Sequence, residues 1–204
     1  MLKIKNIIFD LGGIFIDIHY PKTEKAFIDL NVSNFDEFYT QHHASEIFEL
    51  LETGKLSPEE FYKTFREKTG SNIQNESIRD AWSALLGEFF MDRLQWLEEI
   101  RKRYNTYLFS NTNKIHYDAF TEIFSKQTGL KNFDDYFIKA YYSHECGFRK
   151  PYTESYQRIL DEQNLIASET LFIDDTPPNI EGAKQAGLQA VLLLPGQSIT
   201  ELGL

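Results

Sequence analysis

The chain has 204 residues, of which 42% are hydrophobic and 25% are charged, so a disordered, collagen-like or coiled-coil chain is excluded. It carries 31 acidic against 21 basic side chains and a formal charge of −10, which disfavours binding to nucleic acids and to anionic membrane surfaces. Its single cysteine, Cys146, excludes an internal disulfide and a cysteine-rich metal site.

The chain length allows one large domain or a core with an insert. The first apolar run ends at Asp10 and is too short for the core of a signal peptide. No other run approaches the ~18 apolar residues that a membrane-spanning helix requires. We therefore expect a cytoplasmic protein with no membrane partner, and the sequence does not indicate an oligomeric state.

The first predicted element is a strand at residues 7–9, an apolar run that ends at Asp10. Three later apolar runs have the same form, and each is followed by a polar residue or a turn: they lie at residues 106–109, 171–173 and 190–194. Short continuous apolar runs are typical of strands that are buried on both faces, as in a parallel sheet.

The stretch that follows the first strand has a helical pattern and no clear buried strand. Ser57 is a good helix N-cap, with Pro58 in the first turn and Glu60 at the capping-box position. This helix is expected to end near Gly70, because glycine is a natural helix stop. A further short helix is predicted at residues 79–86.

Helical patterns also separate the later apolar runs, at residues 91–104, 154–164 and 179–186. This alternation of strand and helix indicates an α/β fold with a doubly wound parallel sheet. We expect residues 1–15 and 89–204 to form this core, and residues 16–88 to form an all-helical cap. An insert after the first strand lies over the carboxyl edge of the sheet, where open α/β folds bind ligands.

Polar side chains follow three of the predicted strands: Asp10, Ser110, and the pair Asp174 and Asp175. These side chains can meet, because the carboxyl ends of parallel strands share one edge of the sheet. Crowded carboxylates repel one another and raise their pKa values. A hard cation that prefers oxygen ligands, such as Mg²⁺, would relieve that repulsion. Lys150 could supply a fixed positive charge opposite the carboxylates.

Four motifs carry a resemblance to a known family, at residues 9–13 (FDLGG), 109–113 (FSNTN), 147–151 (GFRKP) and 172–175 (FIDD), the last running on to 179–183 (NIEGA). In this order and spacing they resemble the haloacid dehalogenase superfamily of hydrolases across essentially the whole chain. They are also similar to stretches of the bacterial α-glucose-1-phosphate phosphatases. The resemblance implies a Rossmann-like core, and the helical insert matches the cap that this superfamily places over its active site.

The resemblance also implies roles for the residues at the sheet edge. Asp10 would be the nucleophile that forms an aspartyl-phosphate, which divides one displacement into two steps. Asp10 would also bind Mg²⁺, together with the backbone carbonyl of Gly12 and the carboxylate of Asp175. Asp174 would support the metal directly or through water.

The phosphoryl group would be held by Ser110 and the amide of Asn111, and Lys150 would neutralise the nucleophile and the transferring group. Phosphoryl transfer needs mainly positioning and charge stabilisation, and this set of residues supplies both. The implied function is a Mg²⁺-dependent phosphatase that acts on a small phosphorylated metabolite, with a sugar phosphate as the expected case.

Gly12 departs from the family pattern, because phosphatases of this superfamily usually carry a second aspartate there as general acid and base. Such catalysis is typically worth about 10²–10⁴-fold. Asp17 and His19 lie beyond the first turn and cannot be placed at the leaving group from the sequence. The loss would matter least for a good leaving group such as an anomeric sugar oxygen. A glycine here is also compatible with a backbone of positive φ.

Two other functions remain open. In a metal-independent haloacid dehalogenase the aspartate attacks carbon, but dehalogenases usually lack an acidic pair such as Asp174 and Asp175. A catalytically weak binding protein on the same fold is supported only by Gly12. At the level of single residues, Asp10 could instead be a turn aspartate at a strand end, and the acidic pair could cap a helix.

Several other polar and aromatic residues are expected to have structural roles. Arg149 is interpreted as structural rather than catalytic. Cys146 is not expected to be a nucleophile, because no helix N-terminus or histidine is clearly arranged to activate it. Solvated or packing roles are expected for the remaining candidates in the insert, which are His42, His43, Phe38, Tyr39 and Phe48.

Overall fold

The computed structural model describes residues 3–32, 35, 39–40 and 43–204. Its core is a five-stranded sheet with the strand order β7-β6-β1-β8-β9, and the neighbouring strands are parallel. In chain order these strands are β1 (Asn6–Phe9), β6 (Asn105–Ser110), β7 (Lys139–Tyr142), β8 (Thr170–Asp174) and β9 (Gln189–Leu192). The parallel α/β fold that the apolar runs predict is confirmed.

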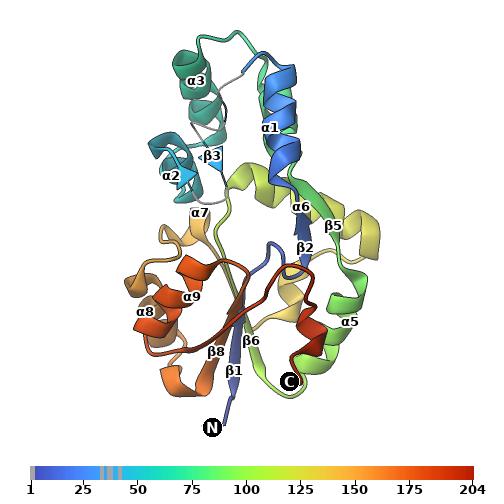
Figure 1. Cartoon of the computed structure of the whole chain (residues 1–204), viewed down its shortest axis with the longest axis vertical. Coiled ribbons are helices and arrows are strands. Elements are labelled where there is room, and N and C mark those ends of the chain that lie inside the picture. The colour runs from blue at the N-terminus through green and yellow to red at the C-terminus, as the bar shows by residue number, and fades with distance from the viewer. Residues whose placement is uncertain (1–2, 33–34, 36–38, 41–42) are drawn as a thin grey trace.

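The central strand β1 alternates its side chains between two helical layers. Ile7 and Phe9 pack into a cluster with α5 (Met91–Ile100) and α6 (Lys114–Thr128). Ile8 packs on the opposite face, against α8 (Thr153–Glu162) and α9 (Pro177–Gln185). Helices therefore cover both faces of the sheet, and the carboxyl ends of its strands point toward the insert at the top of Figure 1. The remaining core helices are α7 (Ser143–Cys146) and three 3-10 turns, η2 (Phe133–Tyr136), η3 (Ala167–Glu169) and η4 (Ile199–Glu201).

Strand β7 was not predicted from the sequence. It lies at the edge of the sheet, and only its last residues, Tyr141 and Tyr142, are buried. Lys139, at its start, is exposed. An edge strand that buries half of its length lacks the continuous apolar run that reveals a central strand.

The insert is joined to the core by a short antiparallel ribbon, in which β2 (Ile16–Ile18) pairs with β5 (Leu86–Phe89). Between these strands lie α1 (Tyr20–Asp29), α2 (Glu46–Glu52), α3 (Pro58–Thr69) and α4 (Asn75–Ser83). These helices bury a core of their own, rich in aromatic rings, that includes Phe27, Phe48, Phe61, Phe65 and Trp82. The insert therefore has its own apolar core above the carboxyl edge of the sheet.

The predicted capping box at the start of α3 is confirmed. The backbone N–H of Glu60 donates to Ser57 Oγ at 3.3 Å, and Glu60 Oε2 accepts from the backbone N–H of Ser57 at 2.9 Å. The helix ends at Gly70, which has a left-handed backbone with φ 64°. These local signals act within one helix, so the sequence is sufficient to place it.

The prediction of an all-helical insert is wrong. The ribbon of β2 and β5 lies at its base, and a second antiparallel pair joins β3 (Tyr39–Thr40) to β4 (His43–Ala44). The helix predicted at residues 79–86 ends at Ser83 in the structure. Leu86, the last residue of the predicted range, instead begins β5. Strands this short leave no periodic signal of their own in the sequence. Phe38 and His42 lie outside the described residues, and for Tyr39 and His43 only the backbone is described.

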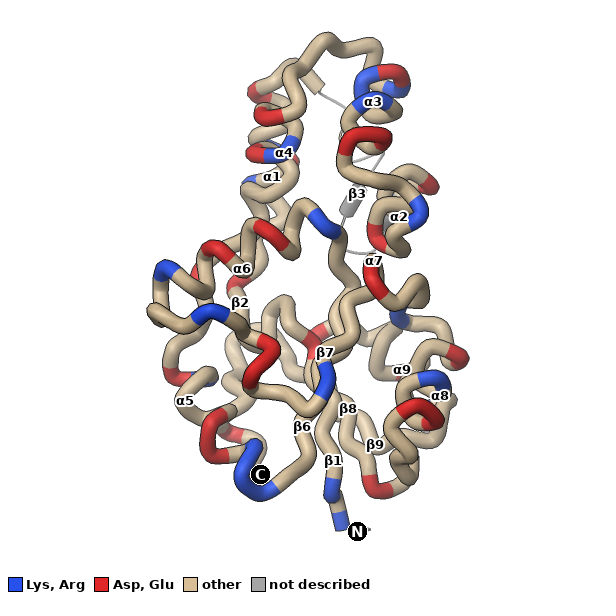
Figure 2. Tube along the Cα trace, turned by 180° about the vertical axis from the view of Figure 1, so that it is seen from behind, with Lys and Arg blue, Asp and Glu red and all other residues tan. Residues whose placement is uncertain are grey.

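None of the helices in the described ranges combines the length and apolarity that crossing a membrane requires. Acidic residues are spread along the chain trace of both the core and the insert, α2 included (Figure 2). The negative charge that the composition indicates is therefore not confined to one segment of the chain.

Candidate active site

Three predicted site residues meet at the carboxyl edge of the sheet. Asp10 directly follows β1 and Asp174 ends β8, and the parallel register that places Phe9 beside Ile173 also brings these two residues together. One carboxylate oxygen from each of Asp10, Asp174 and Asp175 lies within 4.8 Å of the others. The strand-end carboxylates thus form one cluster, as the sequence predicts.

Lys150 completes this cluster. Its Nζ lies 2.7 Å from Asp10 Oδ1 and 2.6 Å from Asp174 Oδ2. Lys150 is 1% exposed and Asp174 is fully buried, so these ion pairs are shielded from water. Burial lowers the pKa of Lys150, but the two carboxylates outweigh burial and the net pKa is raised, which keeps the ammonium charged.

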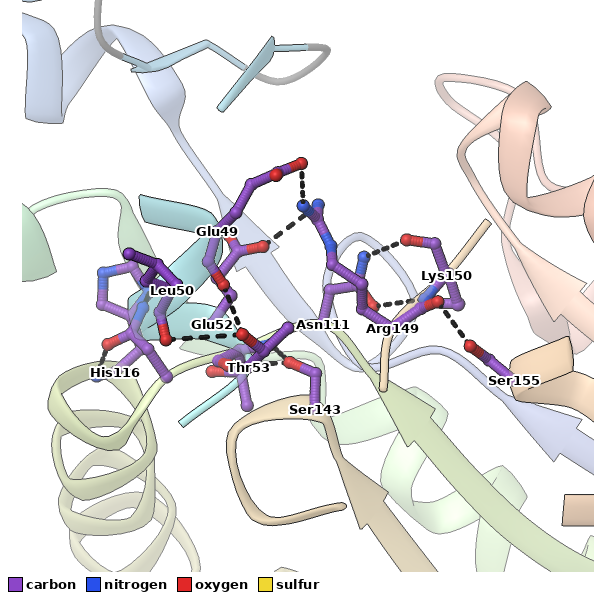
Figure 3. A network of polar contacts seen from close by, with 12 residues as sticks. Glu49, Leu50, Glu52, Thr53, Asn111, His116, Ser143, Arg149, Lys150 and Ser155 are labelled. Atoms are coloured by element: carbon purple, nitrogen blue, oxygen red, sulfur yellow. Dashed lines mark hydrogen bonds and ion pairs between the residues drawn. The ribbon is translucent and has the colours of Figure 1, made fainter. Parts of the chain in front are cut away.

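The loop that carries Lys150 is held by Asn111. The side-chain amide of Asn111 donates to the backbone carbonyl of Lys150 at 3.0 Å, and its Oδ1 accepts from the backbone N–H of Lys150 at 2.9 Å (Figure 3). Ser110, the last residue of β6, is buried, and both Ser110 and Asn111 line the same cavity as Asp10. The Asn111 side chain is therefore occupied in positioning the lysine.

Asp174 is fixed by hydrogen bonds on both of its oxygens. Oδ1 accepts from the backbone N–H of Thr176 at 2.8 Å and from Asn179 Nδ2 at 3.1 Å. Oδ2 accepts from Asn179 Nδ2 at 3.0 Å, in addition to its contact with Lys150. Asp175 has one such partner, Thr176 Oγ1, at 3.0 Å from its Oδ1. Asp175 consequently has more acceptor capacity left for a further ligand.

The cluster has more negative than positive charge. Burial raises the pKa of Asp10 to about 7; Lys150 opposes this shift, and the charges of Asp174 and Asp175 add to it. Burial, followed by the charge of Asp174, also raises the pKa of Asp175. Three carboxylates against one ammonium is an arrangement that a hard divalent cation would relieve, and the oxygen donors fit Mg²⁺.

The turn after Asp10 is shaped to let Asp175 approach the backbone. Gly13 has φ 68°, and a Cβ at this position would lie 2.2 Å from Asp175 Oδ2, so no other residue fits. Gly12 is different, because its φ is outside the positive range and a Cβ there would meet Ile18 Cγ1 at 3.2 Å. The positive φ considered for Gly12 is therefore found at Gly13 instead.

The cluster lies in a cavity of about 740 Å³ that both the core and the insert line. Among the described insert residues that line it are three polar ones that the sequence analysis did not single out: Tyr20 from α1, and Glu49 and Glu52 from α2. Burial, and then the charges of Asp175 and Asp10, raise the pKa of Tyr20, so its phenol stays protonated at neutral pH. Nothing in the local sequence marks these residues, because only the packing of the insert brings them over the site.

Asp17, which the sequence could not place, lies on β2 and lines the cavity. Its Oδ2 is 2.7 Å from His19 Nε2, and both side chains are partly exposed, at 42% and 39%. The β2–β5 ribbon, which was not predicted, is the element that carries Asp17 to the cavity wall. A carboxylate other than the three strand-end residues is thus present in the cavity wall.

Arg149 and Cys146 have contacts that agree with the structural roles expected for them. Arg149 Nη1 lies 3.0 Å from Glu49 Oε1, and Arg149 Nη2 lies 3.1 Å from Glu52 Oε2, so the guanidinium joins the core to the insert (Figure 3). Burial raises the pKa of the Cys146 thiol, whose Sγ lies 3.4 Å from the carbonyl of Phe148. A thiol in this state is a poor nucleophile.

A family model described as haloacid dehalogenase-like hydrolase matches residues 4–187. A D-ribitol-5-phosphate phosphatase of Bacteroides thetaiotaomicron is 36% identical over 187 residues, which cover 91% of this chain and 90% of that protein. A sesquiterpene phosphatase of Aspergillus oryzae is 27% identical over 185 residues, covering 90% of this chain and 87% of that protein.

Solved structures support the same assignment. A haloacid dehalogenase family enzyme from Bacteroides thetaiotaomicron, an alanine variant in complex with magnesium and inorganic phosphate, has a TM-score of 0.90 and 30% identity, with 96% of each chain covered. The 2-haloacid dehalogenase of Pseudomonas syringae has a TM-score of 0.59 and 20% identity over 98% of this chain and 91% of that one, which is a likeness of fold alone. The extent of the model match and the identity to the first relative show that the chain belongs to the haloacid dehalogenase-like hydrolase family.

Proposed function

We propose that the chain is a Mg²⁺-dependent phosphatase that hydrolyses a small phosphorylated metabolite, a sugar or polyol phosphate, through an aspartyl-phosphate on Asp10. One observation carries this proposal: Asp10 lies on the floor of a cavity, held by Lys150 and beside Asp174 and Asp175. Related proteins add support, since one hydrolyses D-ribitol 5-phosphate and another binds magnesium and phosphate.

Asp10, Asp175 and the backbone carbonyl of Gly12 would hold the metal ion, and Asp174 would support it. The limited free acceptor capacity of Asp174 favours a contact through water. When bound, Mg²⁺ supplies positive charge against the phosphoryl oxygens. Mg²⁺ would also offset the repulsion that raises the pKa values of Asp10 and Asp175.

In the first step, a carboxylate oxygen of Asp10 forms a bond to phosphorus while the bond from phosphorus to the leaving oxygen breaks. The leaving oxygen takes up a proton. In the second step, a water oxygen bonds to phosphorus and the bond to Asp10 breaks, which releases phosphate and restores the carboxylate. Lys150 keeps Asp10 oriented and offsets the charge that both steps concentrate there.

Ser110 and Asn111 would bind the phosphoryl oxygens. We assign this contact to the hydroxyl of Ser110 and to the backbone N–H of Asn111, because the Asn111 side chain already holds Lys150. Ser110 ends β6 and Asn111 follows it, next to the strand that precedes Asp10. The phosphoryl group would thus lie between β1 and β6, at the floor of the cavity.

This chain must protonate the leaving oxygen differently from phosphatases that carry an aspartate at the position of Gly12. Gly12 provides no carboxylate, and among the described cavity residues Asp17 is the acidic side chain that lies on the β2 ribbon above the site. Substrates whose leaving oxygen needs little protonation would therefore react fastest. The dehalogenase alternative is not favoured, because Asp174 and Asp175 place two further charges beside Asp10 that a reaction without metal would not need.

A screen of phosphorylated metabolites, with phosphate release measured in Mg²⁺ and in EDTA, tests the proposal. We expect turnover of sugar or polyol phosphates that EDTA abolishes and added Mg²⁺ restores. The variant Asp175→Ala should need far more Mg²⁺ than the wild type, and Mg²⁺ should raise the melting temperature of the wild type but not of this variant. Equal turnover in EDTA would contradict the metal requirement, and no turnover of any ester would support a binding protein instead.

A further inference from the structure

The part of the cavity lining that the insert contributes is acidic. Glu49 and Glu52 reach it from α2, and Asp17 reaches it from β2. Together with Asp10 and Asp175, the described lining contains five carboxylates. A substrate with a second anionic group, in addition to its phosphate, would need a positive charge in this cavity that is free to bind it.

Within the described part of the chain, three lining residues have a permanent positive charge, and each already has polar contacts within the protein. Lys150 is held by Asp10 and Asp174. Arg93 Nη1 donates to the backbone carbonyls of Gly13 and Ile14, each at 2.7 Å. Arg93 Nη1 is therefore occupied in holding the turn after Asp10, and Arg93 has no ion pair with a glutamate of the insert among the described residues. His116 also lines the cavity but is neutral, since burial lowers its pKa to about 4.

Arg149 is the third of these cations and the one above the site. Each of its two terminal nitrogens faces a different glutamate of α2, with 3.0 Å from Nη1 to Glu49 Oε1 and 3.1 Å from Nη2 to Glu52 Oε2 (Figure 3). The side chain of Glu52 is 6% exposed, so its ion pair with Arg149 is shielded from water and is costly to break. One arginine shared by two glutamates leaves this wall with a net negative charge.

We propose that this cavity selects phosphate monoesters whose leaving group is an uncharged polyhydroxy compound, and that Glu49 and Glu52 exclude leaving groups carrying a second anion. The inference rests on the proposed phosphatase function. Hydroxyl groups donate hydrogen bonds to carboxylates, so a sugar or polyol can hydrogen-bond to the carboxylates of this wall. A carboxylate or second phosphate meets like charges, and the arginine that could bind it is already engaged.

A matched pair of esters tests the charge rule: D-erythritol 4-phosphate and 4-phospho-D-erythronate, which differ in a terminal hydroxymethyl or carboxylate group. We expect wild-type kcat/KM to favour the neutral ester by about tenfold or more. Glu49→Gln and Glu52→Gln should each reduce this preference, because they free part of Arg149 for the anionic ester. Glu46→Gln, on the same helix but outside the cavity lining, removes the same charge and should keep the preference.

The outcomes separate this inference from the proposed function. Wild-type protein that hydrolyses phosphate esters but treats both members of the pair alike would overturn the charge rule alone. A preference that survives in both glutamine variants would overturn the assignment to Glu49 and Glu52. Failure to hydrolyse any ester would contradict the phosphatase function itself. Glu49 is 48% exposed, so its glutamine variant is expected to fold even if the buried Glu52 variant does not.

Discussion

The Lys150 ammonium lies 2.7 Å from Asp10 Oδ1, although the two residues belong to distant parts of the chain. The contact depends on two long-range constraints. Pairing of β1 with β8 sets Asp10 beside Asp174, and the Asn111 side chain holds the backbone of Lys150. The reactive carboxylate and its counter-charge are thus positioned by the fold rather than by neighbours in sequence.

Replacing this lysine should damage both stability and activity. Lys150→Met leaves Asp174 fully buried without its cation, and breaking such a pair costs about 3–5 kcal/mol. A loss of this size should lower the melting temperature by roughly 10 °C. Activity should fall by about 10²-fold or more, because a fixed charge beside the nucleophile is lost.

The double variant Lys150→Met with Asp174→Asn is the control for this interpretation. Removing the unpaired charge of Asp174 should recover part of the stability that Lys150→Met loses, but none of the activity. Thermal unfolding and phosphate release measured on both variants check the two effects separately. A single variant as stable as the wild type would show that the buried ion pairs do not support the fold.

The stability of the protein should fall on mild acidification because of His116. Its ring accepts a hydrogen bond from Asn113 Nδ2 at Nδ1, over 3.2 Å, and its Nε2 faces the carbonyl of Trp82 at 2.9 Å, an arrangement that suits the neutral ring. Burial lowers the pKa of His116 from 6.5 to about 4. The unfolded chain therefore binds more protons in that range, and stability is lost as pH falls from about 6.5 to about 4.

Glutamine at this position provides a matched test, because Gln can make both hydrogen bonds without titrating. Denaturant unfolding at pH 7 and pH 5 should show a smaller loss of stability for His116→Gln than for the wild type. Part of the loss should remain, since burial also lowers the pKa of His144 to about 4. Identical pH dependence in the two proteins would rule out His116 as a source of the effect.

The positions of these residues show how far the sequence alone can predict the structure. The sequence was sufficient to place Asp10, Asp174 and Asp175 together, because each ends or follows an apolar strand. The carboxyl ends of parallel strands lie at the same edge of the sheet. Lys150 could be added only through its motif. The pairing of Asn111 with the lysine backbone was not foreseen, because it is a contact between two loops.

The wall contributed by the insert could not be predicted. Tyr20, Glu49 and Glu52 reach the cavity because α1 and α2 pack above the sheet, and that packing depends on an aromatic core assembled from the whole insert. The β2–β5 ribbon, which carries Asp17, spans only a few residues on each side. Segments this short have no periodicity, and their partners are distant in the chain.

The absence of a carboxylate at Gly12 should make the rate depend strongly on the leaving group. Wild-type protein should hydrolyse aryl and anomeric phosphates much faster than simple alkyl phosphates, because these leaving oxygens need less protonation. A series of esters of graded leaving-group pKa measures this dependence. A flat series would show that another acid already acts, and Asp17→Asn should then restore a steep dependence.

Gly12→Asp is the complementary variant. The φ of Gly12 is not positive, so the backbone itself does not exclude a side chain, but the added Cβ would lie 3.2 Å from Ile18 Cγ1 and the Ile18 side chain must shift slightly to admit it. The new carboxylate should accelerate alkyl phosphates by about tenfold or more and leave aryl phosphates little changed. Acceleration of both classes by the same factor would contradict a role in protonating the leaving group.

The most direct test of the central claim is to trap the phosphorylated enzyme. Wild-type protein would be quenched in acid during steady turnover with Mg²⁺, digested, and analysed by mass spectrometry for a phosphoryl group on the peptide that contains Asp10. Asp10→Asn, which keeps the shape of the side chain but removes its nucleophilic charge, is the matched control. We predict a phosphoryl group on Asp10 in the wild type, and neither label nor turnover in the folded variant. Turnover within a few-fold of wild type in Asp10→Asn would contradict covalent catalysis at this residue.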